Sequence, residues 1–312
     1  RWAVNAREAY IEYASDLYLL RFGKMIFDWS VTDTVSPSDN INPRDWEDII
    51  EWEKVGLPAV SVRYGKDAFV EVVYLPFFSP SKLPEGYWRR KLPLGLTDGE
   101  QEILSRGREQ FAVRASAITW DCDFGISFYK GYSYSPSFKL KATELIPVYR
   151  NEEVCSISAA KSAAGFDFRA EAGYFRQQDE DDFIQYVLGA DREWGEVFSP
   201  TDTLYVFIQY INEKKTQDDT PVPFEIIDFR RVFNNVAMGR IKYSPDGDEW
   251  SFNLEGSYNL SDKDYYIQPS VGWKKSNFEV EGGIDILGGS GESFFGGYKD
   301  NDRTYIKIVW HF

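Results

Sequence analysis

The chain repeatedly alternates apolar with polar or charged residues over segments of about ten residues, and this pattern restricts its fold more than any other feature. The segment WSFNLEGSYNL (250–260) has aromatic, aliphatic or glycine residues at its even positions and serine, asparagine or glutamate at its odd positions. FDFRAEAGY (166–174) and FEVEGGIDI (278–286) follow the same rule. Because side chains alternate between the two faces of a β-strand, each segment predicts a strand with one apolar and one charged face.

Composition indicates the environment that suits such strands. Aromatic residues make up 17% of the 312 residues and charged residues 27%, while the mean hydropathy is only −0.43. No stretch approaches the roughly 18 consecutive apolar residues of a membrane-spanning helix. These properties are typical of a transmembrane β-barrel, whose charged faces point into a water-filled interior. The alternative is a soluble β-sandwich or barrel rich in tyrosine, and the repetition of the pattern favours the membrane protein.

Strand signals occur in fifteen segments of the chain. The expected strands are 4–14, 17–29, 59–65, 68–76, 110–120, 123–132, 150–161, 165–176, 182–194, 202–213, 232–244, 249–260, 264–275, 278–288 and 303–312. A closed bacterial barrel has an even number of strands, so we expect roughly sixteen, with one strand preceding Arg1. The fold class expected is therefore all-β: one transmembrane antiparallel β-barrel domain over residues 1–312.

The lengths of the connections predict which edge of the barrel faces which compartment. Short turns at 14–16, 64–67 and 120–123 are expected on the periplasmic side. The long segments expected as extracellular loops are 30–58, 77–109, 133–149, 214–231 and 289–302. Capping patterns predict two short helices in these loops, at about 43–54 after Asn42 and at about 98–106 after Thr97.

Two stretches resemble an outer-membrane family of porin-like barrels of largely unknown function, related to alginate-export-type barrels. The matching residues of the first stretch are Arg7, Glu8, Ala9, Tyr10, Gly23, Lys24, Trp29, Asp39, Asn42, Pro43, Arg44 and Asp45. Those of the second stretch are Arg169, Ala170, Glu171 and Tyr174. Met25 and Ser30 depart from the family pattern, which has glutamine and glycine there. The resemblance implies the fold and an outer-membrane location in a Gram-negative bacterium more than it implies a substrate.

The motif SPSDNINPRDW (36–46) gives the loop candidates. Asp39 and Asn42 can hydrogen-bond to the nearby backbone, and Pro43 fixes the direction of the chain. Arg44 and Asp45 can pair with inward charges and pin the loop. We expect Asp39, Asn42, Arg44 and Asp45 to form a loop constriction that narrows the lumen, or a lid across the rim. The motif could equally shape the loop without touching a solute.

Strand alternation assigns a set of charges to the lumen. These expected pore-lining residues are Arg21, Arg63, Glu71, Arg114, Arg169, Glu171, Arg240, Lys242, Glu255, Glu279, Glu281 and Lys307. Basic residues dominate the earlier strands and acidic residues the last ones, so two unlike walls would impose a transverse field on polar solutes. The alternative is a set of ion pairs that only makes the barrel rigid.

Catalysis and cofactor chemistry find little support. The one histidine, His311, has no nucleophile motif beside it, and the chain has neither a CxxCH haem motif nor a zinc spacing. We expect no enzyme, no cofactor and no metal, and both Cys122 and Cys155 unpaired. The net charge of −15 argues against nucleic acid as a partner.

These patterns predict a porin-like channel for passive diffusion of small polar or ionic solutes. Two alternatives stay open: a plugged or narrow barrel that exports or transfers a hydrophobic molecule with periplasmic partners, and a barrel housing a partner protein such as a cytochrome. Expected partners are outer-membrane lipid and lipopolysaccharide, the barrel-assembly machinery, small solutes and a second copy in a homo-oligomer. The terminal TYIKIVWHF predicts that Trp310 and Phe312 act as the assembly signal.

Overall fold

One large sheet contains all the long strands of the chain. The computed structural model describes residues 6–89, 97–103, 109–178, 181–216, 231–245 and 249–311. The sheet is antiparallel and has 15 strands, which follow one another in the order of the chain, as a meander. Each of the fifteen segments expected as strands overlaps one of them, so the all-β, antiparallel prediction is confirmed. A sixteenth strand and the closure of the sheet stay predictions.

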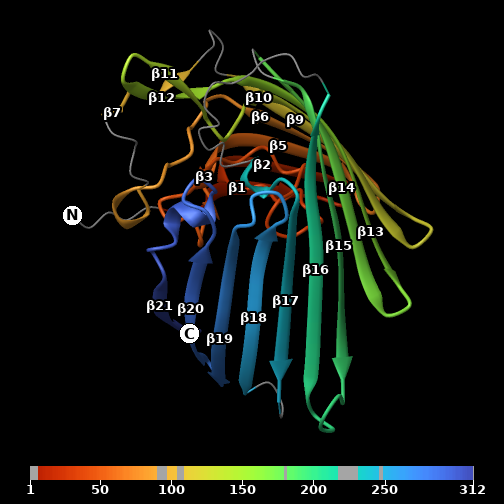
Figure 1. Cartoon of the computed structure of the whole chain (residues 1–312). Helices are drawn as coiled ribbons and strands as arrows, with labels where there is room; N and C mark the ends of the chain where they lie inside the picture. The colour runs from red at the N-terminus through yellow and green to blue at the C-terminus, as the bar shows by residue number, and fades with distance from the viewer. Residues whose placement is uncertain are drawn as a thin grey trace. The chain divides into compact units, whose positions relative to one another are not determined.

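Two compact units divide the chain. The first comprises residues 1–160, 170–186 and 213–232, and the second comprises the remainder. The complete strands of the first unit's sheet are β1 (Ala9–Ala14), β2 (Tyr18–Met25), β5 (Leu57–Gly65), β6 (Phe69–Leu75), β9 (Gln110–Thr119) and β10 (Cys122–Tyr132). The second unit contains β17 (Val236–Ser244), β18 (Trp250–Asn259), β19 (Tyr265–Lys275), β20 (Phe278–Gly288) and β21 (Arg303–Trp310), which lie side by side in Figure 1.

Four strands contribute residues to both units. They are β13 (Asn151–Ala163), β14 (Phe166–Gln177), β15 (Phe183–Gly195) and β16 (Thr203–Lys215). In the first unit, one edge of the sheet carries short turns and the other carries the long connections 26–56, 76–109 and 133–150. We call these the short-turn edge and the long-loop edge. In the second unit, the connection 289–302 lies opposite the tight turn at 276–277.

Smaller elements occupy the long connections. The segment 26–56, which we call the first loop, contains β3 (Arg44–Asp45) and β4 (Glu53–Lys54), paired as a two-stranded sheet. A second small sheet contains β7 (Thr97–Asp98), β8 (Glu102–Ile103), β11 (Ser137–Lys141) and β12 (Glu144–Tyr149) (Figure 1). The described helical turns are short 3₁₀ turns: η1 (Gly86–Trp88), η2 (Arg231–Phe233) and η3 (Phe295–Tyr298).

The helix expected at 43–54 is wrong. Its expected cap, Asn42, instead accepts a hydrogen bond from the Phe27 amide at 2.7 Å and donates to the carbonyls of Met25 and Val55. The Trp46 amide donates a hydrogen bond to the carbonyl of Lys82. This amide therefore bonds to a neighbouring segment and not within a helix. Tertiary partners therefore satisfy polar groups that a helix would have bonded internally.

The prediction of a helix at 98–106 is also wrong over the residues that the structure describes. Residues 98–103 contribute to β7 and β8, which both pair in parallel with β12. The Gly99 amide, for example, donates to the carbonyl of Leu145 at 2.9 Å. Residues 104–106 lie outside the described part of the chain.

Burial on the sheet is the reverse of that in a soluble protein. On β21, Ile306, Ile308 and Trp310 are 76%, 62% and 70% exposed, although all three are apolar. On the opposite face, polar groups such as Asp285 and Gln209 are buried. Exposed aromatic and aliphatic residues recur along the strands of both units. We call the two surfaces the apolar face and the polar face.

The hydrophobic core of the first unit lies toward the long-loop edge of its sheet. Phe27, Trp29 and Ile41 of the first loop pack in it with residues near the strand ends, such as Met25 and Leu57. The loop thus supplies the apolar surface that a second sheet would supply in a sandwich.

Candidate functional site

The first loop lies against the polar face of the sheet, where β14 holds it through one carboxylate. Glu171 is 2% exposed and accepts hydrogen bonds from the amides of Val31, Thr32 and Ser38. The hydroxyls of Thr32 and Ser36 donate to the same carboxylate, at 3.0 and 2.6 Å. Three backbone amides and two hydroxyls therefore supply hydrogen bonds to this buried carboxylate, as anion-binding backbone nests do.

Gly173 allows the loop to approach the sheet closely. A Cβ atom at this position would lie 2.9 Å from the Cβ of Pro37 and 3.3 Å from its carbonyl oxygen. Real Cβ atoms avoid such contacts, so any larger residue would push the loop outward. The close contact lies two residues along β14 from Glu171, on the same face. Together the two positions form one docking site for residues 31–38.

A buried ion network crosses the base of the loop. Asp39 pairs with Arg44 at 3.1 Å and with Lys54 at 2.5 Å, and it is 2% exposed. Lys54 also pairs with Asp28 at 2.8 Å and donates to the carbonyl of Phe27. Burial opposes ionisation of Asp28, but hydrogen bonds from Lys54 and Ser30 outweigh it and hold its pKa below the ordinary value.

A second set of contacts joins the first loop to its neighbours. The Arg44 guanidinium lies 5.3 Å from the ring of Trp52 and 5.6 Å from that of Tyr134, in cation–π range. Asp45 pairs with Lys82 at 2.6 Å, and hydrogen bonding to Asp45 raises the pKa of Lys82. The four residues expected as a constriction are thus brought together, and each contacts protein groups that shape the loop.

Charges expected in the lumen alternate in sign across three neighbouring strands of the first unit. Arg63 on β5 lies directly opposite Glu71 on β6, which lies opposite Arg114 on β9. Glu71 is nearly buried and accepts the Ser61 hydroxyl at 2.6 Å. Arg114 is also within electrostatic range of Glu171, the residue that holds the loop. This row connects the sheet wall with the loop electrostatically.

Cross-strand pairing recurs at two further positions expected in the lumen. Arg21 pairs with Glu12 on the adjacent strand at 2.7 Å. Arg169 pairs with Asp191. Opposite charges on neighbouring strands support the alternative that many of these residues rigidify the wall.

The polar face of the second unit is more open to solvent than that of the first. Arg240 is 43% exposed even though it pairs with Glu255 at 2.7 Å. Lys242, on the same strand and face, is exposed. Lys307 is exposed and lies opposite Glu281, which accepts the Tyr305 hydroxyl at 2.6 Å.

The polar face of the second unit also contains tightly held acidic residues. Asp285 is fully buried and receives Arg303 at 2.5 Å and Gln268 at 2.7 Å. Glu279 pairs with Lys274 at 2.7 Å and lies 3.6 Å from the imidazole of His311. The last strands therefore carry basic partners for their acidic residues instead of a purely acidic wall.

Aromatic residues mark one edge of the second unit on its apolar face. Trp250 lies opposite Trp273, with ring centroids 6.5 Å apart, and Trp273 lies 6.3 Å from Phe278. Phe278 lies opposite Trp310 on β21. Trp310, expected in the assembly signal, thus belongs to a continuous aromatic row, while Phe312 lies outside the described residues.

Sequence reasoning missed several residues of this site. Thr32, Ser36 and Gly173 have no pattern that connects them with Glu171. The sequence gives no sign that Lys54 pairs with Asp39, because its local pattern predicts Lys54 at the end of a helix. The one usable signal was the excess of serine, threonine and aspartate in 30–40, which is typical of side chains that bond to backbone.

Two comparisons with known proteins found no match. No protein-family model matches the chain, and no curated protein matches its sequence.

No described helix has the length and apolar character needed to cross a membrane. Within the described ranges, no three histidine, cysteine, aspartate or glutamate side chains converge as a metal site requires. Cys122 and Cys155 are both free.

Proposed function

We propose that this chain is a porin-like channel of a Gram-negative outer membrane that admits small polar or ionic solutes by passive diffusion. The observation that carries the proposal is the reversed burial of the sheet. Side chains such as Ile306 and Ile308 are exposed, while Glu171 and Asp285 on the opposite face are buried. In water this arrangement would leave a large apolar surface exposed to solvent, which is unfavourable, whereas the acyl chains of a bilayer would cover it.

Closure of the sheet is part of the proposal. β1 and β21 are the two ends of the strand order, and so form the edges of the sheet in the described part of the chain. Such edges would be costly in a bilayer, where no water can bond to them. A closed barrel of roughly sixteen strands removes both edges. The resemblance to porin-like barrels is consistent with this closure. Membership of that family stays a prediction.

The proposed passage follows the polar face of the second unit. Arg240, Lys242 and Lys307 are accessible there. In the first unit, the loop held by Glu171 covers part of the polar face and supports the idea of a narrowed lumen. Charges of both signs along such a passage would favour ions and dipolar solutes over apolar ones.

Single-channel recording tests the proposal. The purified chain is reconstituted into a planar bilayer and its conductance is recorded in symmetric salt and then under a salt gradient. We expect stable conductance steps and a reversal potential that changes when Lys242 and Lys307 are both replaced by glutamine. The double replacement Ser251→Gln and Ser257→Gln, on the same face, serves as the uncharged control. A protein that is folded and inserted but gives no steps would overturn the channel.

A second candidate has one observation in its favour. The first loop buries many of its residues against the polar face, as a plug would. A plugged or narrow barrel would transfer its substrate with periplasmic partners instead of conducting ions. Silent wild-type protein that conducts after the variant Glu171→Gln would support this candidate over the open channel.

A further inference from the structure

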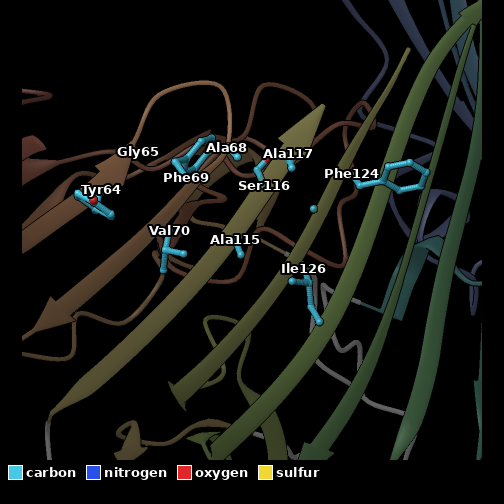
Figure 2. A pocket seen from close by; sticks show the side chains of 11 residues that line it. Tyr64, Gly65, Ala68, Phe69, Val70, Ala115, Ser116, Ala117, Phe124 and Ile126 are labelled. Carbon is cyan, nitrogen blue, oxygen red and sulfur yellow. The ribbon is translucent and has the colours of Figure 1, made fainter. Parts of the chain in front are cut away.

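The apolar face of the first unit is hollowed into a furrow. Two adjoining hollows, of about 530 and 460 Å³, share Ala115 and Ile126. Small residues form the floor, and Figure 2 shows Ala115 between the larger side chains of Val70 and Ile126. The furrow is thus a groove in a surface that otherwise carries large exposed apolar residues.

The second hollow extends the furrow toward the long-loop edge. It is lined by Phe128 on β10, Cys155 on β13, and Ala172 and Tyr174 on β14. Phe128 lies directly opposite Cys155. Each of these strands meets the long-loop edge a few residues beyond these positions.

Charged residues stand where the furrow reaches that edge. Lys130, two residues beyond Phe128, lies opposite Glu153 and pairs with it at 2.6 Å. Arg176, two residues beyond Tyr174, lies 3.8 Å from the same carboxylate. The two cations are 55% and 69% exposed and share Glu153. A second carboxylate, Asp182, accepts the Tyr174 hydroxyl.

We propose that this furrow binds one phosphate-bearing lipid of the surrounding leaflet, with its phosphate on Lys130 and Arg176 and an acyl chain over Ala172 and Ala115. The inference rests on the proposed membrane location. Two exposed cations beside an apolar groove complement an anionic headgroup attached to a hydrocarbon chain. Glu153 holds both cations at the mouth of the groove before the phosphate arrives.

The length of the furrow fits one leaflet. Residues 124–130 of β10 span about 20 Å along the strand at ordinary β-strand rise. With a strand tilt of roughly 40°, this corresponds to about 15 Å of depth, half of a hydrocarbon core of about 30 Å. An acyl chain that begins at Lys130 would therefore end near Phe124.

Native mass spectrometry of the purified chain in a neutral detergent tests the site. Phosphatidylglycerol and phosphatidylcholine with identical acyl chains are titrated separately, and bound lipids are counted. We expect the wild type to prefer phosphatidylglycerol, and Lys130→Ala with Arg176→Ala to weaken its binding on the order of tenfold. Glu153→Gln should strengthen that binding, because it frees both cations. Ala172→Trp should weaken the binding of both lipids equally, because the tryptophan side chain fills the groove.

A matched control uses a cation on the apolar face of the second unit, which contributes no residue to the furrow. Lys275 lies opposite the outward-facing Phe278 and pairs with Glu249 at 3.7 Å, so Lys275→Ala should leave lipid binding unchanged. Equal phosphatidylglycerol affinity in the wild type and the double alanine variant would overturn the lipid site. A lipid-free dimer that Ala172→Trp dissociates would also overturn it and identify a second copy as the occupant.

The same preparation separates this site from the proposed function. Insertion is measured by co-flotation with phosphatidylcholine vesicles after an alkaline carbonate wash. If the chain inserts and conducts but shows no phosphatidylglycerol preference, only the lipid site is wrong. If it fails to insert, the membrane channel itself is wrong.

Discussion

The Thr32 hydroxyl donates a hydrogen bond to the Glu171 carboxylate at 3.0 Å across a separation of 139 residues. This contact and the four beside it dock the first loop on the polar face of the sheet. A carboxylate buried among amides and hydroxyls keeps its hydrogen-bond partners only while the loop stays in place. The position of the first loop therefore depends on the Glu171 side chain.

Replacing Glu171 with glutamine should release the first loop. The glutamine amide has one acceptor oxygen and brings two donors toward groups that already donate, so several bonds are lost. We expect a loss of about 2–4 kcal/mol in the free energy of unfolding and faster hydrogen exchange at Val31, Thr32 and Ser38. Glu255→Gln on the polar face of the second unit is the control. Unchanged exchange in the Glu171 variant would show that the carboxylate does not hold the loop.

Gly173→Val should displace the loop without breaking the sheet. Its Cβ would meet Pro37 at 2.9 Å, so the loop must move. We expect faster proteolysis within 31–38 and, in a conducting barrel, a larger conductance step. Ala172→Val adds similar bulk to the opposite face of the same strand and should preserve the wild-type proteolysis rate. Equal proteolysis of the two variants would contradict the close approach.

Asn42→Ala should destabilise the exit of the loop from β2. It leaves the buried Phe27 amide without its acceptor and removes two donors, at a cost of about 1–3 kcal/mol. Asn42→Asp keeps the acceptor for Phe27 but sets its second carboxylate oxygen against the carbonyls of Met25 and Val55, so it should be no more stable than the alanine variant. Thermal unfolding in detergent ranks the three proteins. An aspartate variant as stable as the wild type would show that the two donated bonds contribute nothing.

Acid should loosen the tie between Asp28 and Lys54. The pKa of Asp28 lies below its ordinary value of 3.8. Its contribution to stability is therefore complete above about pH 3.8 and is lost as the pH falls through the lowered pKa. Proteolysis by pepsin between pH 2 and 4 should show increasing cleavage near residue 28 as the pH falls. Asp28→Asn should show no such change with pH over this range, and parallel profiles would contradict the assignment.

The sequence by itself determined where the strands lie and which side chains share a face. Both follow from alternation, a local property of extended backbone, so WSFNLEGSYNL fixed the faces of β18 without knowledge of its neighbours. Which charges lie opposite one another, such as Arg240 and Glu255, depends on the register of the two strands. Only strand pairing decides this register.

Only the tertiary structure decided the conformation of the first loop. The local signals at 43–54 favoured a helix, but Asn42, Arg44 and Trp46 found bonding partners in other segments of the chain. Glu171 could be placed on the polar face from the sequence, yet its donors lie on a loop far away in the chain. A buried carboxylate must be satisfied by whatever donors the fold brings to it, and no local pattern specifies these donors.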